Sequence, residues 1–501
     1  MHFRFPPLCL ILAALASGAS AEVTLAPLFT DHAILQRDQP VPIWGTADPD
    51  EIVTVSFAGQ AVATTADAEG KWLVSLLPMP ANASGQSLTV SSDTMIVLDD
   101  ILVGDLWLCG GQSNMEWPLR NANDAEAEIA AAQYPLIRHI KIERRIARDP
   151  ITEARGSWTM CTPDTAPHFT AVGYFFARKL QAELNVPIGL VNSNWGGTPV
   201  EAWLPPSALQ SLETRVLAAS HQAVSYHRFA QQLASYQERL IEWETRRTAA
   251  VKVGENSEEP APSAPWTPGA ENHTAVLNNG MIAPLAPAAL RGVIWYQGEA
   301  NADQPETYRA LFSAMITSWR EQFQQPDLPF YWVQLANFGS AENDGWAFLR
   351  EAQTQTLELP HTGQAVIIDI GDAKDIHPRN KQDVGDRLAR LALARDYGRP
   401  VEDSGPTFAA AVFEDTQVAV SFTHAKGLHT RDDEAPLGFE IAGKNGEFHA
   451  ATARLDHKRV LLSAPGVMNP LYVRYAWRDH LDVNLVNGEG LPAAPFRTDT
   501  L

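Results

Sequence analysis

A serine at residue 113 follows a short apolar run and two glycines. The run is Leu106–Cys109, and from Cys109 onward the chain reads CGGQSNMEW. A strand that ends in Gly-Gly-x-Ser predicts a sharp turn that lifts the serine side chain out of the sheet, because glycine makes such a turn without a Cβ clash. The Gly-x-Ser-x-Gly pattern of α/β-hydrolases is absent, since residue 115 is Met115. The longer string favours a nucleophilic Ser113 over a structural serine at a turn.

His377 is the second residue suited to acyl transfer. Two carboxylates, Asp375 and Asp372, precede it by two and five residues. A carboxylate on Nδ1 of a catalytic histidine fixes its tautomer and stabilises the imidazolium that forms when it takes a proton. The pattern therefore indicates His377 as the base. We predict Asp375 as the acid that orients it, with Glu299 from another strand end and Asp372 as alternatives.

Two further loops that follow predicted strands carry groups able to stabilise negative charge. They read NWGGTPVEAW and WYQGEAN. The backbone N–H of Gly196 or Gly197 and the side-chain amide of Gln297 are candidate oxyanion donors. Because the crevice of an open parallel sheet lies at the carboxyl ends of its strands, we expect these loops to meet the serine and the histidine. The predicted substrate contacts are Gln112, Asn114, Trp195 and Glu299.

The elements that must position these groups alternate between short apolar runs and amphipathic helices. Near-continuous apolar strands are typical of a parallel sheet buried on both faces, and their alternation with helices predicts a three-layer α/β/α domain. The predicted strands are 106–109, 188–191, 292–295, 331–334 and 365–368. The predicted helices are 172–184, 306–323, 348–359 and 382–397.

The pattern of apolar, polar and turn residues divides the chain into four parts. A signal peptide is predicted over residues 1–21, a β domain over 22–100, and the catalytic domain over 101–403. A C-terminal β domain is expected over 404–501, for which packing against the N-terminal one is an option. Residues 205–275 do not fit the α/β rhythm and are predicted to be an insertion, with a polar helix over 228–247 and a proline-rich loop. Its role is either scaffolding or forming one wall of the cleft.

Composition narrows the function classes. The formal net charge of −21 disfavours nucleic acid as a partner, because like charges repel. Fourteen tryptophans are compatible with sugar binding, although most are expected in the core. No CxxC or HExxH motif is present, so we expect neither a metal nor another cofactor. Cys109 and Cys161 are free to pair after export, but a buried free thiol is favoured for Cys109.

The first residues have the layout of a secretory signal. Arg4 provides a basic start, Leu8–Leu15 a short apolar segment, and Ala19–Ala21 a cleavage site of small residues. The apolar segment is too short to span a bilayer. We therefore expect an exported protein, periplasmic or extracellular, that does not associate with the membrane after cleavage.

The strings GQSNMEW, NWGGTPVEAW, WYQGEAN and DIHPRNK resemble the sialate O-acetylesterase family, a branch of the SGNH hydrolases. The strings VRYAW and GLPAAPFRTD near the end of the chain extend the resemblance, which runs from about residue 25 to residue 499. It implies a flavodoxin-like α/β/α catalytic domain flanked by β-sandwich-like parts. It also implies Ser113 as nucleophile and His377 as base.

The resemblance further implies an oxyanion hole made of the N–H of Ser113, a glycine N–H of the second string and a side-chain amide of the third. That amide belongs to Gln297, where the family of SGNH enzymes usually has asparagine. The aspartate that often stands three residues before the histidine is Lys374 here, and Asp375 stands two residues before it.

The expected activity is removal of acetyl groups from O-acetylated sialic acids by a serine-hydrolase mechanism. Deacetylation of xylan or another polysaccharide is the first alternative, because it needs the same catalytic groups. A sialate carboxylate would favour an arginine in the cleft, and Arg120 is the candidate that is near in sequence. A non-catalytic carbohydrate-binding protein is the second alternative, which the presence of both Ser113 and His377 disfavours.

Overall fold

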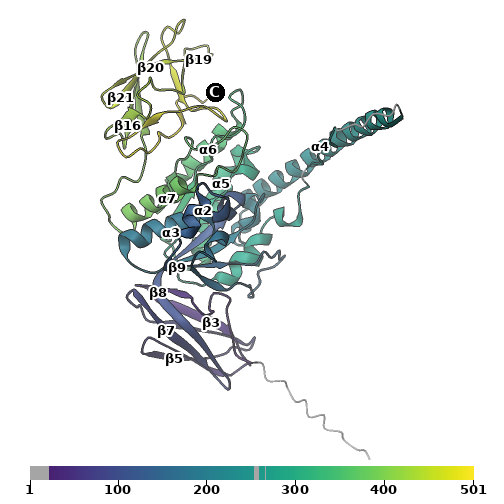
Figure 1. The fold of residues 1–501 in the computed structure, drawn as a ribbon, viewed down its shortest axis with the longest axis vertical. Helices are drawn as coiled ribbons and strands as arrows, with labels where there is room; N and C mark the ends of the chain where they lie inside the picture. Colours follow the sequence, from purple (N-terminus) through teal and green to yellow (C-terminus); the bar gives the residue numbers. More distant parts are fainter. Residues whose placement is uncertain (1–21, 253–258, 266, 501) are drawn as a thin grey trace, which may run out of the picture.

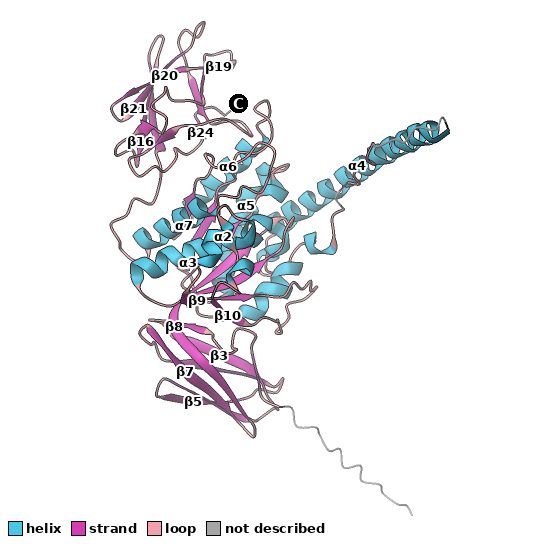
Figure 2. Cartoon of the chain, in the orientation of Figure 1, coloured by secondary structure: helices cyan, strands magenta, loops and turns pink. Residues whose placement is uncertain are grey.

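The computed structural model describes residues 22–252, 259–265 and 267–500, so the signal peptide predicted over residues 1–21 lies outside the described residues. Figure 1 shows a β domain at each end of the long axis and an α/β region between them. Figure 2 shows that the helices are gathered in this central region. The two β domains lie at opposite ends, so the option that they pack against each other is wrong.

The N-terminal domain is built from short strands whose side chains alternate between buried and exposed. In β6 (Lys71–Leu76), Trp72, Val74 and Leu76 are buried and the residues between them are exposed. One sheet has the order β1-β3-β6, and β7 links β4 and β5 to β8. The other strands are β1 (Thr24–Leu25), β2 (Ile34–Gln36), β3 (Val41–Thr46), β4 (Ile52–Phe57), β5 (Gln60–Thr65) and β7 (Asn82–Ser91).

One long strand, β8 (Met95–Gly111), belongs to both the N-terminal and the central region. Its first six residues alternate in exposure and pair with β7, whereas every residue from Ile101 to Gly111 is buried. The second half lies between β11 and β12 in the central sheet, where both faces are covered. The predicted boundary at residue 100 therefore falls inside a continuous strand, which ties the two regions together.

The central sheet has the strand order β10-β9-β11-β8-β12-β13-β14. Neighbouring strands from β9 to β14 are parallel, and β10 is antiparallel at the edge. The carboxyl ends of the parallel strands therefore face the same side of the domain. The bounds are β9 (Tyr134–Lys141), β10 (Trp158–Cys161), β11 (Ile188–Asn194), β12 (Gly292–Tyr296), β13 (Phe330–Val333) and β14 (Thr362–Ala365).

Helices cover both faces of this sheet, which confirms the predicted three-layer α/β/α architecture. On one face α3 (Ala171–Leu184) packs against α7 (Lys381–Arg395), and on the other α5 (Pro305–Gln322) packs against α6 (Gly345–Gln355). Each face has its own buried apolar cluster. Cys109 and Cys161 both lie in the cluster beneath α3 and α7, and both are free thiols. This is the state that the sequence favours for Cys109. Short helices are α1 (Ser113–Glu116) and α2 (Ala125–Ala130).

The fifth predicted strand is misplaced along the chain. β14 covers Thr362–Ala365, and residues 366–368 of the apolar run lie beyond its end. These side chains are buried because they join two cores: Ile367 packs in the catalytic domain, whereas Val366 and Ile368 pack in the C-terminal domain. An apolar run that bridges two domains has the same appearance in the sequence as a buried strand.

The insertion contains a helix about twice as long as predicted. α4 covers Leu212–Lys252, and only Ala218 and His221 are buried in it. Its first half packs against α5, and Figure 1 shows its second half projecting away from the body of the molecule. The returning chain contacts the projecting part, since Trp243 Nε1 donates to the carbonyl oxygen of Glu259 at 2.9 Å.

The C-terminal domain, residues 404–500, contains two four-stranded antiparallel sheets around a separate apolar core. Their orders are β15-β16-β21-β20 and β19-β18-β22-β24, with β17 and β23 forming a small pair. None of the described helices combines the length and hydropathy needed to cross a membrane. The strands are β15 (Thr407–Phe413), β16 (Val418–Thr423), β17 (His429–Thr430), β18 (Phe439–Ala442), β19 (Phe448–Ala450), β20 (Thr452–Asp456), β21 (Arg459–Ser463), β22 (Tyr472–Tyr475), β23 (Leu485–Val486) and β24 (Phe496–Arg497).

Candidate active site

The turn after β8 delivers Ser113 to the carboxyl edge of the central sheet. Gly111 ends the strand with φ +133°, and a Cβ there would lie 2.2 Å from the carbonyl oxygen of Tyr296. Only glycine fits this close approach to the neighbouring strand. Two residues later Ser113 begins α1, so its side chain is carried on a short helix just beyond the sheet.

Ser113 and His377 meet although they lie 264 positions apart in the chain. Ser113 Oγ and His377 Nε2 are 2.9 Å apart, within the hydrogen-bond range of a nucleophile and its base. His377 is carried by the loop between β14 and α7. Burial and the nearby Lys381 lower the pKa of His377, while Asp375 raises it. The net lowering favours the neutral imidazole, the form in which a histidine can accept a proton.

Of the three candidate acids, Asp375 lies nearest to the other imidazole nitrogen. Asp375 Oδ1 is 3.7 Å from His377 Nδ1, which is ion-pair range but longer than a hydrogen bond. The same oxygen accepts the backbone N–H of His377 at 2.9 Å, so its hydrogen bond is to the backbone of His377 and not to the imidazole. Asp372 is exposed and accepts the backbone N–H of Lys374, and Glu299 contacts Asn114 instead of the histidine.

The predicted oxyanion donors divide into two groups. Among the described residues, the backbone N–H groups of Ser113 and Gly197 have no hydrogen-bond acceptor, which leaves them available to a ligand. The N–H of Gly196 donates to Glu116 Oε2 at 3.2 Å, and a Cβ on Gly196 would lie 3.2 Å from Cβ of Ser113. Gly196 therefore packs against the serine, but its N–H is already occupied.

Gln297 is not placed where the prediction needs it. Its side chain is fully buried, and its amide donates to Asn301 Oδ1 at 2.7 Å and to the carbonyl oxygen of Thr198 at 3.3 Å. The hydroxyl of Tyr308 donates to the remaining Gln297 oxygen at 2.9 Å. Its polar atoms are thus used to hold the loops after β11 and β12 together. The amide expected as an oxyanion donor is therefore already bound to protein acceptors in this structure.

The three other predicted substrate contacts also have protein partners. Gln112 is buried and accepts the backbone N–H of Ala300 at 3.3 Å through Oε1, although it lines the cleft. Asn114 is buried among the loops behind the serine. Trp195 is partly buried, and the guanidinium of Arg144 lies over its ring at 5.1 Å from the ring centre. Trp195 is not among the described residues that line the cleft.

A cleft of about 1040 Å³ opens above Ser113 and His377. The insertion forms one wall of it, because side chains of the first half of α4 line the space, among them Tyr226 and Phe229. The role that the sequence left open is thus decided in favour of a cleft wall. The loop before α6 and a side chain of the C-terminal domain, Asp479, contribute to the lining as well.

A model of the family described as "Carbohydrate esterase, sialic acid-specific acetylesterase" matches residues 261–394, which include Glu299 and His377. A rat sialate O-acetylesterase is 30% identical over 440 residues, covering 78% of this chain and 77% of the rat protein. The mouse sialate O-acetylesterase is 31% identical over 432 residues, covering 78% of this chain and 76% of the mouse protein. The chain belongs to the sialate O-acetylesterase family. It is accordingly an esterase that acts on carboxylic esters.

A solved structure agrees with this membership. A carbohydrate acetylesterase from Xanthomonas citri is 40% identical and covers 96% of this chain and 100% of the solved one, with a TM-score of 0.81. The similarity therefore includes both β domains and the insertion, and not the catalytic domain alone. Membership of the sialate O-acetylesterase family and this structural similarity together identify a carbohydrate acetylesterase.

Two side chains next to Ser113 and His377 were not singled out from the sequence. Trp117 stacks on His377, with ring centres 5.0 Å apart and an angle of 15° between the ring planes. Lys381 is fully buried, and its ammonium donates to Asn114 Oδ1 at 2.5 Å. Both residues belong to strings that carry the family resemblance, GQSNMEW and DIHPRNK, so their presence in those strings was the available signal.

The insertion is held in place by charged groups along the cleft. Arg228 of α4 forms an ion pair with Asp303, and His221 Nδ1 lies 3.3 Å from Glu201 Oε1. Burial raises the pKa of Glu201, whereas His221 lowers it. The predicted sialate-binding arginine, Arg120, instead lies against His168 on an exposed surface and does not line the cleft.

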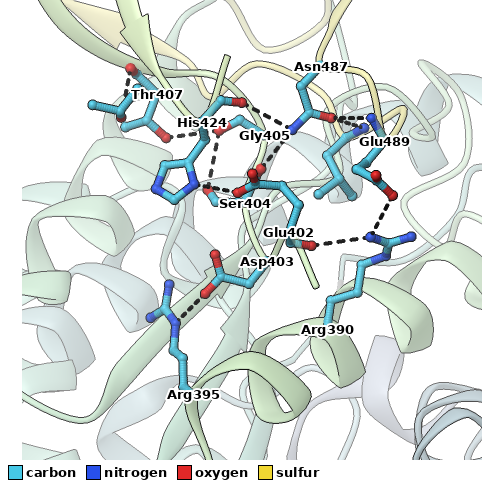
Figure 3. Close-up of polar contacts among 12 residues, drawn as sticks. Arg390, Arg395, Glu402, Asp403, Ser404, Gly405, Thr407, His424, Asn487 and Glu489 are labelled. Atoms are coloured by element: carbon cyan, nitrogen blue, oxygen red, sulfur yellow. Dashed lines mark hydrogen bonds and ion pairs between the residues drawn. The ribbon is translucent and has the colours of Figure 1, made fainter. Parts of the chain in front are cut away.

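One group of residues outside the cleft has the composition of a metal site. Glu402, Asp403 and His424 offer ligand atoms that lie within 4.8 Å of one another. Figure 3 shows that these side chains already have partners: His424 Nδ1 is 2.6 Å from a Glu402 oxygen, and Arg395 donates to Asp403 at 2.6 Å. An arginine bound to a candidate ligand disfavours a cation. The group lies where the catalytic and C-terminal domains join, and none of its three residues lines the cleft above Ser113.

Proposed function

We propose that this protein hydrolyses acetyl esters on carbohydrate hydroxyls through an acyl-enzyme formed on Ser113. The observation that carries the proposal is the 2.9 Å separation of Ser113 Oγ and His377 Nε2 at the base of a cleft large enough for a sugar. A serine and a histidine at this distance, with unoccupied backbone N–H groups beside them, are the parts that acyl transfer requires.

The reaction begins when His377 Nε2 takes the proton of Ser113 as Oγ attacks the acetyl carbonyl carbon. The tetrahedral oxyanion is bound by the backbone N–H groups of Ser113 and Gly197. Collapse of this intermediate breaks the ester bond, and the imidazolium gives its proton to the departing sugar oxygen. Water then attacks the acetyl-serine with His377 again as base, and acetate leaves with Ser113 restored. Asp375 stabilises the imidazolium formed in both halves of the reaction.

The relatives' names make O-acetylated sialic acid the first candidate substrate. Its carboxylate would favour a cation in the cleft, and among the described lining residues the one arginine, Arg228, is paired with Asp303. Lys141 and Arg144 are the cations near Gly196, and both bind Glu116. The carboxylates of the lining are Glu299, Asp303, Glu342, Asp344 and Asp479.

This charge balance favours an uncharged O-acetylated sugar, such as an acetylated xylo-oligosaccharide, as the second candidate. Carboxylates accept hydrogen bonds from sugar hydroxyls but repel an anionic substrate. The aromatic side chains of Tyr226, Phe229 and Trp346 also line the cleft and offer apolar faces for a sugar ring. Export to the periplasm or the medium is part of the proposal, supported by the pattern of residues 1–21.

The test is release of acetate from two substrates by the purified mature protein. O-acetylated sialic acid and an acetylated xylo-oligosaccharide are incubated in parallel, and acetate is measured against a Ser113→Ala control. Release from at least one of them by the wild type alone is the expected result. Release from neither, by a protein that is folded by circular dichroism, would overturn the proposed function.

A further inference from the structure

We propose that Lys381 is a positioning residue for the catalytic pair: its buried ammonium fixes Asn114 between the two catalytic loops and holds a positive charge beside Trp117, the ring that stacks on His377. The inference rests on the proposed function, because it assigns a role within the same site. Lys381 contacts neither Ser113 nor the cleft and therefore acts through its neighbours.

The first part of the role follows from the hydrogen bonds of Asn114. Lys381 Nζ donates to Asn114 Oδ1 at 2.5 Å, which orients the amide so that its nitrogen points the other way. That nitrogen donates to the backbone carbonyl of Ile376 at 3.0 Å and to Glu299 Oε1 at 2.6 Å. Asn114 follows the nucleophile and Ile376 precedes the base in the chain. One amide therefore links the turn that carries Ser113 to the loop that carries His377.

The second part follows from the aromatic rings around the ammonium. Lys381 Nζ lies 5.2 Å from the ring centre of Tyr296 and 5.9 Å from that of Trp117. Both distances are in the range of a cation–π contact. The ring of Trp117 in turn stacks on the imidazole of His377. The ammonium therefore lies near the ring that stacks on the proposed catalytic base.

A purely structural role does not account for a lysine at this position. Lys381 is the first residue of α7, and a cation is disfavoured at the N-terminal end of a helix by the helix dipole. Its side chain has no solvent exposure, and Asn114 is its one hydrogen-bond acceptor among the described residues. A methionine of similar length would fill the same space without the cost of burying a charge. The charge therefore has a use other than packing.

The charged groups around the two side chains determine the direction of the effect. Burial lowers the pKa of Lys381 to about 7, and the carboxylates of Glu299 and Asp375 raise it. Burial also raises the pKa of Glu299, on which Asn114 and Lys381 act in the opposite direction. For His377, burial and Lys381 lower the pKa and Asp375 raises it. Below about pH 7 the ammonium is charged, and this is the range in which His377 would otherwise take up a proton.

This arrangement acts differently on the two proton transfers of the proposed reaction, because a lower pKa makes His377 a weaker base toward Ser113 and a stronger acid toward the sugar oxygen. In the free enzyme, the ammonium disfavours the imidazolium, so His377 stays neutral and able to accept the proton of Ser113 at lower pH. After that proton has moved, the same charge makes the imidazolium a stronger acid toward the departing sugar oxygen. Burial is the largest cause of the lowered pKa of His377, Lys381 acts with it, and Asp375 acts in the opposite direction.

The test compares the pH dependence of kcat/KM for p-nitrophenyl acetate in wild type and Lys381→Met. Loss of the positive charge raises the pKa of His377, so the acidic limb of the profile moves to higher pH. We expect the ratio of kcat/KM at about pH 5.5 to that at about pH 8 to fall by about threefold or more relative to wild type. Lys374→Met is the matched control, because it removes an exposed lysine three residues before His377. Its ratio should stay at the wild-type value.

The outcomes separate this inference from the function on which it rests. If wild-type protein hydrolyses the ester and Lys381→Met only lowers kcat, with no displacement of the acidic limb, Lys381 is structural and the inference is overturned. An equal displacement in Lys374→Met overturns it too, because net charge would then explain the effect. Lys381→Gln, neutral but polar, repeats the test where the methionine variant does not fold. If neither neutral variant folds, the lysine is structural and the inference fails.

Discussion

Trp117 lies flat against His377, with ring centres 5.0 Å apart and ring planes 15° apart. The imidazole is otherwise held by Ser113 on one nitrogen and by the more distant Asp375 on the other. A flat contact over one face of the ring prevents it from rotating away from the serine. We therefore expect the indole to help orient an imidazole whose Nδ1 has no carboxylate within hydrogen-bond distance among the described residues.

Replacing Trp117 with leucine should lower kcat for p-nitrophenyl acetate about tenfold or more, with a smaller change in KM. The reason is that a misplaced general base affects the chemical step more than it affects binding of a small ester. Trp117→Phe keeps a flat ring and should retain most of the wild-type rate. Steady-state kinetics on the two variants check this, and equal losses in both would contradict a role for ring stacking.

Ser113→Ala should abolish ester hydrolysis without unfolding the protein. Loss of the nucleophile in a serine hydrolase costs on the order of 10⁴ or more in kcat. The side chain is small and lies at the end of the sheet, so the thermal melting temperature should stay close to wild type. A folded variant that keeps more than about a tenth of the wild-type rate would show that another residue is the nucleophile.

The identity of the orienting acid can be measured with three amide variants. Asp375→Asn should lower kcat by about tenfold to a hundredfold, because the imidazolium loses its nearest carboxylate. Asp375 raises the pKa of His377, so its loss should also move the acidic limb of kcat/KM to lower pH, opposite to Lys381→Met. Asp372→Asn should behave like wild type.

Glu299→Gln tests the alternative that Glu299, and not Asp375, is the acid that orients His377. Glu299 accepts from Asn114 and has no contact with the imidazole among the described residues, so its effect should be smaller than that of Asp375. A near wild-type Asp375→Asn together with a loss of about a hundredfold in Glu299→Gln would assign the acid to Glu299.

The mature N-terminus can be determined directly. Cleavage after Ala21 should leave Glu22 as the first residue of protein recovered from the periplasm or the medium, because small residues at 19–21 follow a short apolar segment. N-terminal sequencing or intact mass measurement provides the readout. An active form that retains Met1 and is found in the cytoplasm would contradict export.

The sequence locates Ser113 and His377 because strand ends in a parallel sheet converge, and glycines and carboxylates mark the relevant loops. The three-layer fold follows from the same alternation of apolar runs and helices. The place where a strand ends is harder to predict. Residues 366–368 are apolar because they join two cores, and periodicity does not distinguish that from a strand.

The sequence pattern does not predict the direction in which the side chains of the site point. Gln297 follows its strand as an oxyanion donor should, but its amide donates to Asn301 and to the carbonyl oxygen of Thr198. Lys381 stands in a quoted string, but its burial depends on packing against Tyr296 and Trp117, which are distant in sequence. The sequence could not decide whether the insertion forms a wall of the cleft, for the same reason. A polar helix such as α4 does not reveal which of its faces meets the cleft.

The acidity of the cleft leads to a prediction about substrate charge. Glu342 and Asp344 lie in the loop before α6 and line the cleft, and no salt bridge joins either of them to a described residue. Asp344 raises the pKa of neighbouring Asp479, whose burial is the larger cause. These carboxylates repel a sialate but not an uncharged sugar, and the repulsion is strongest at low ionic strength.

Glu342→Gln combined with Asp344→Asn should therefore raise kcat/KM for O-acetylated sialic acid about threefold or more at low salt, and leave that for an acetylated xylo-oligosaccharide unchanged. The gain should shrink as salt is added, because ions screen exposed charges. Glu69→Gln with Asp93→Asn is the matched control, since it changes the net charge equally on exposed turns of the N-terminal domain. If the cleft variant gains nothing on the sialate, or the control gains as much, the lining carboxylates do not select the substrate by charge. If the wild type prefers O-acetylated sialic acid at low salt, that sugar becomes the favoured substrate. Attraction by a cation would then outweigh the repulsion by these carboxylates.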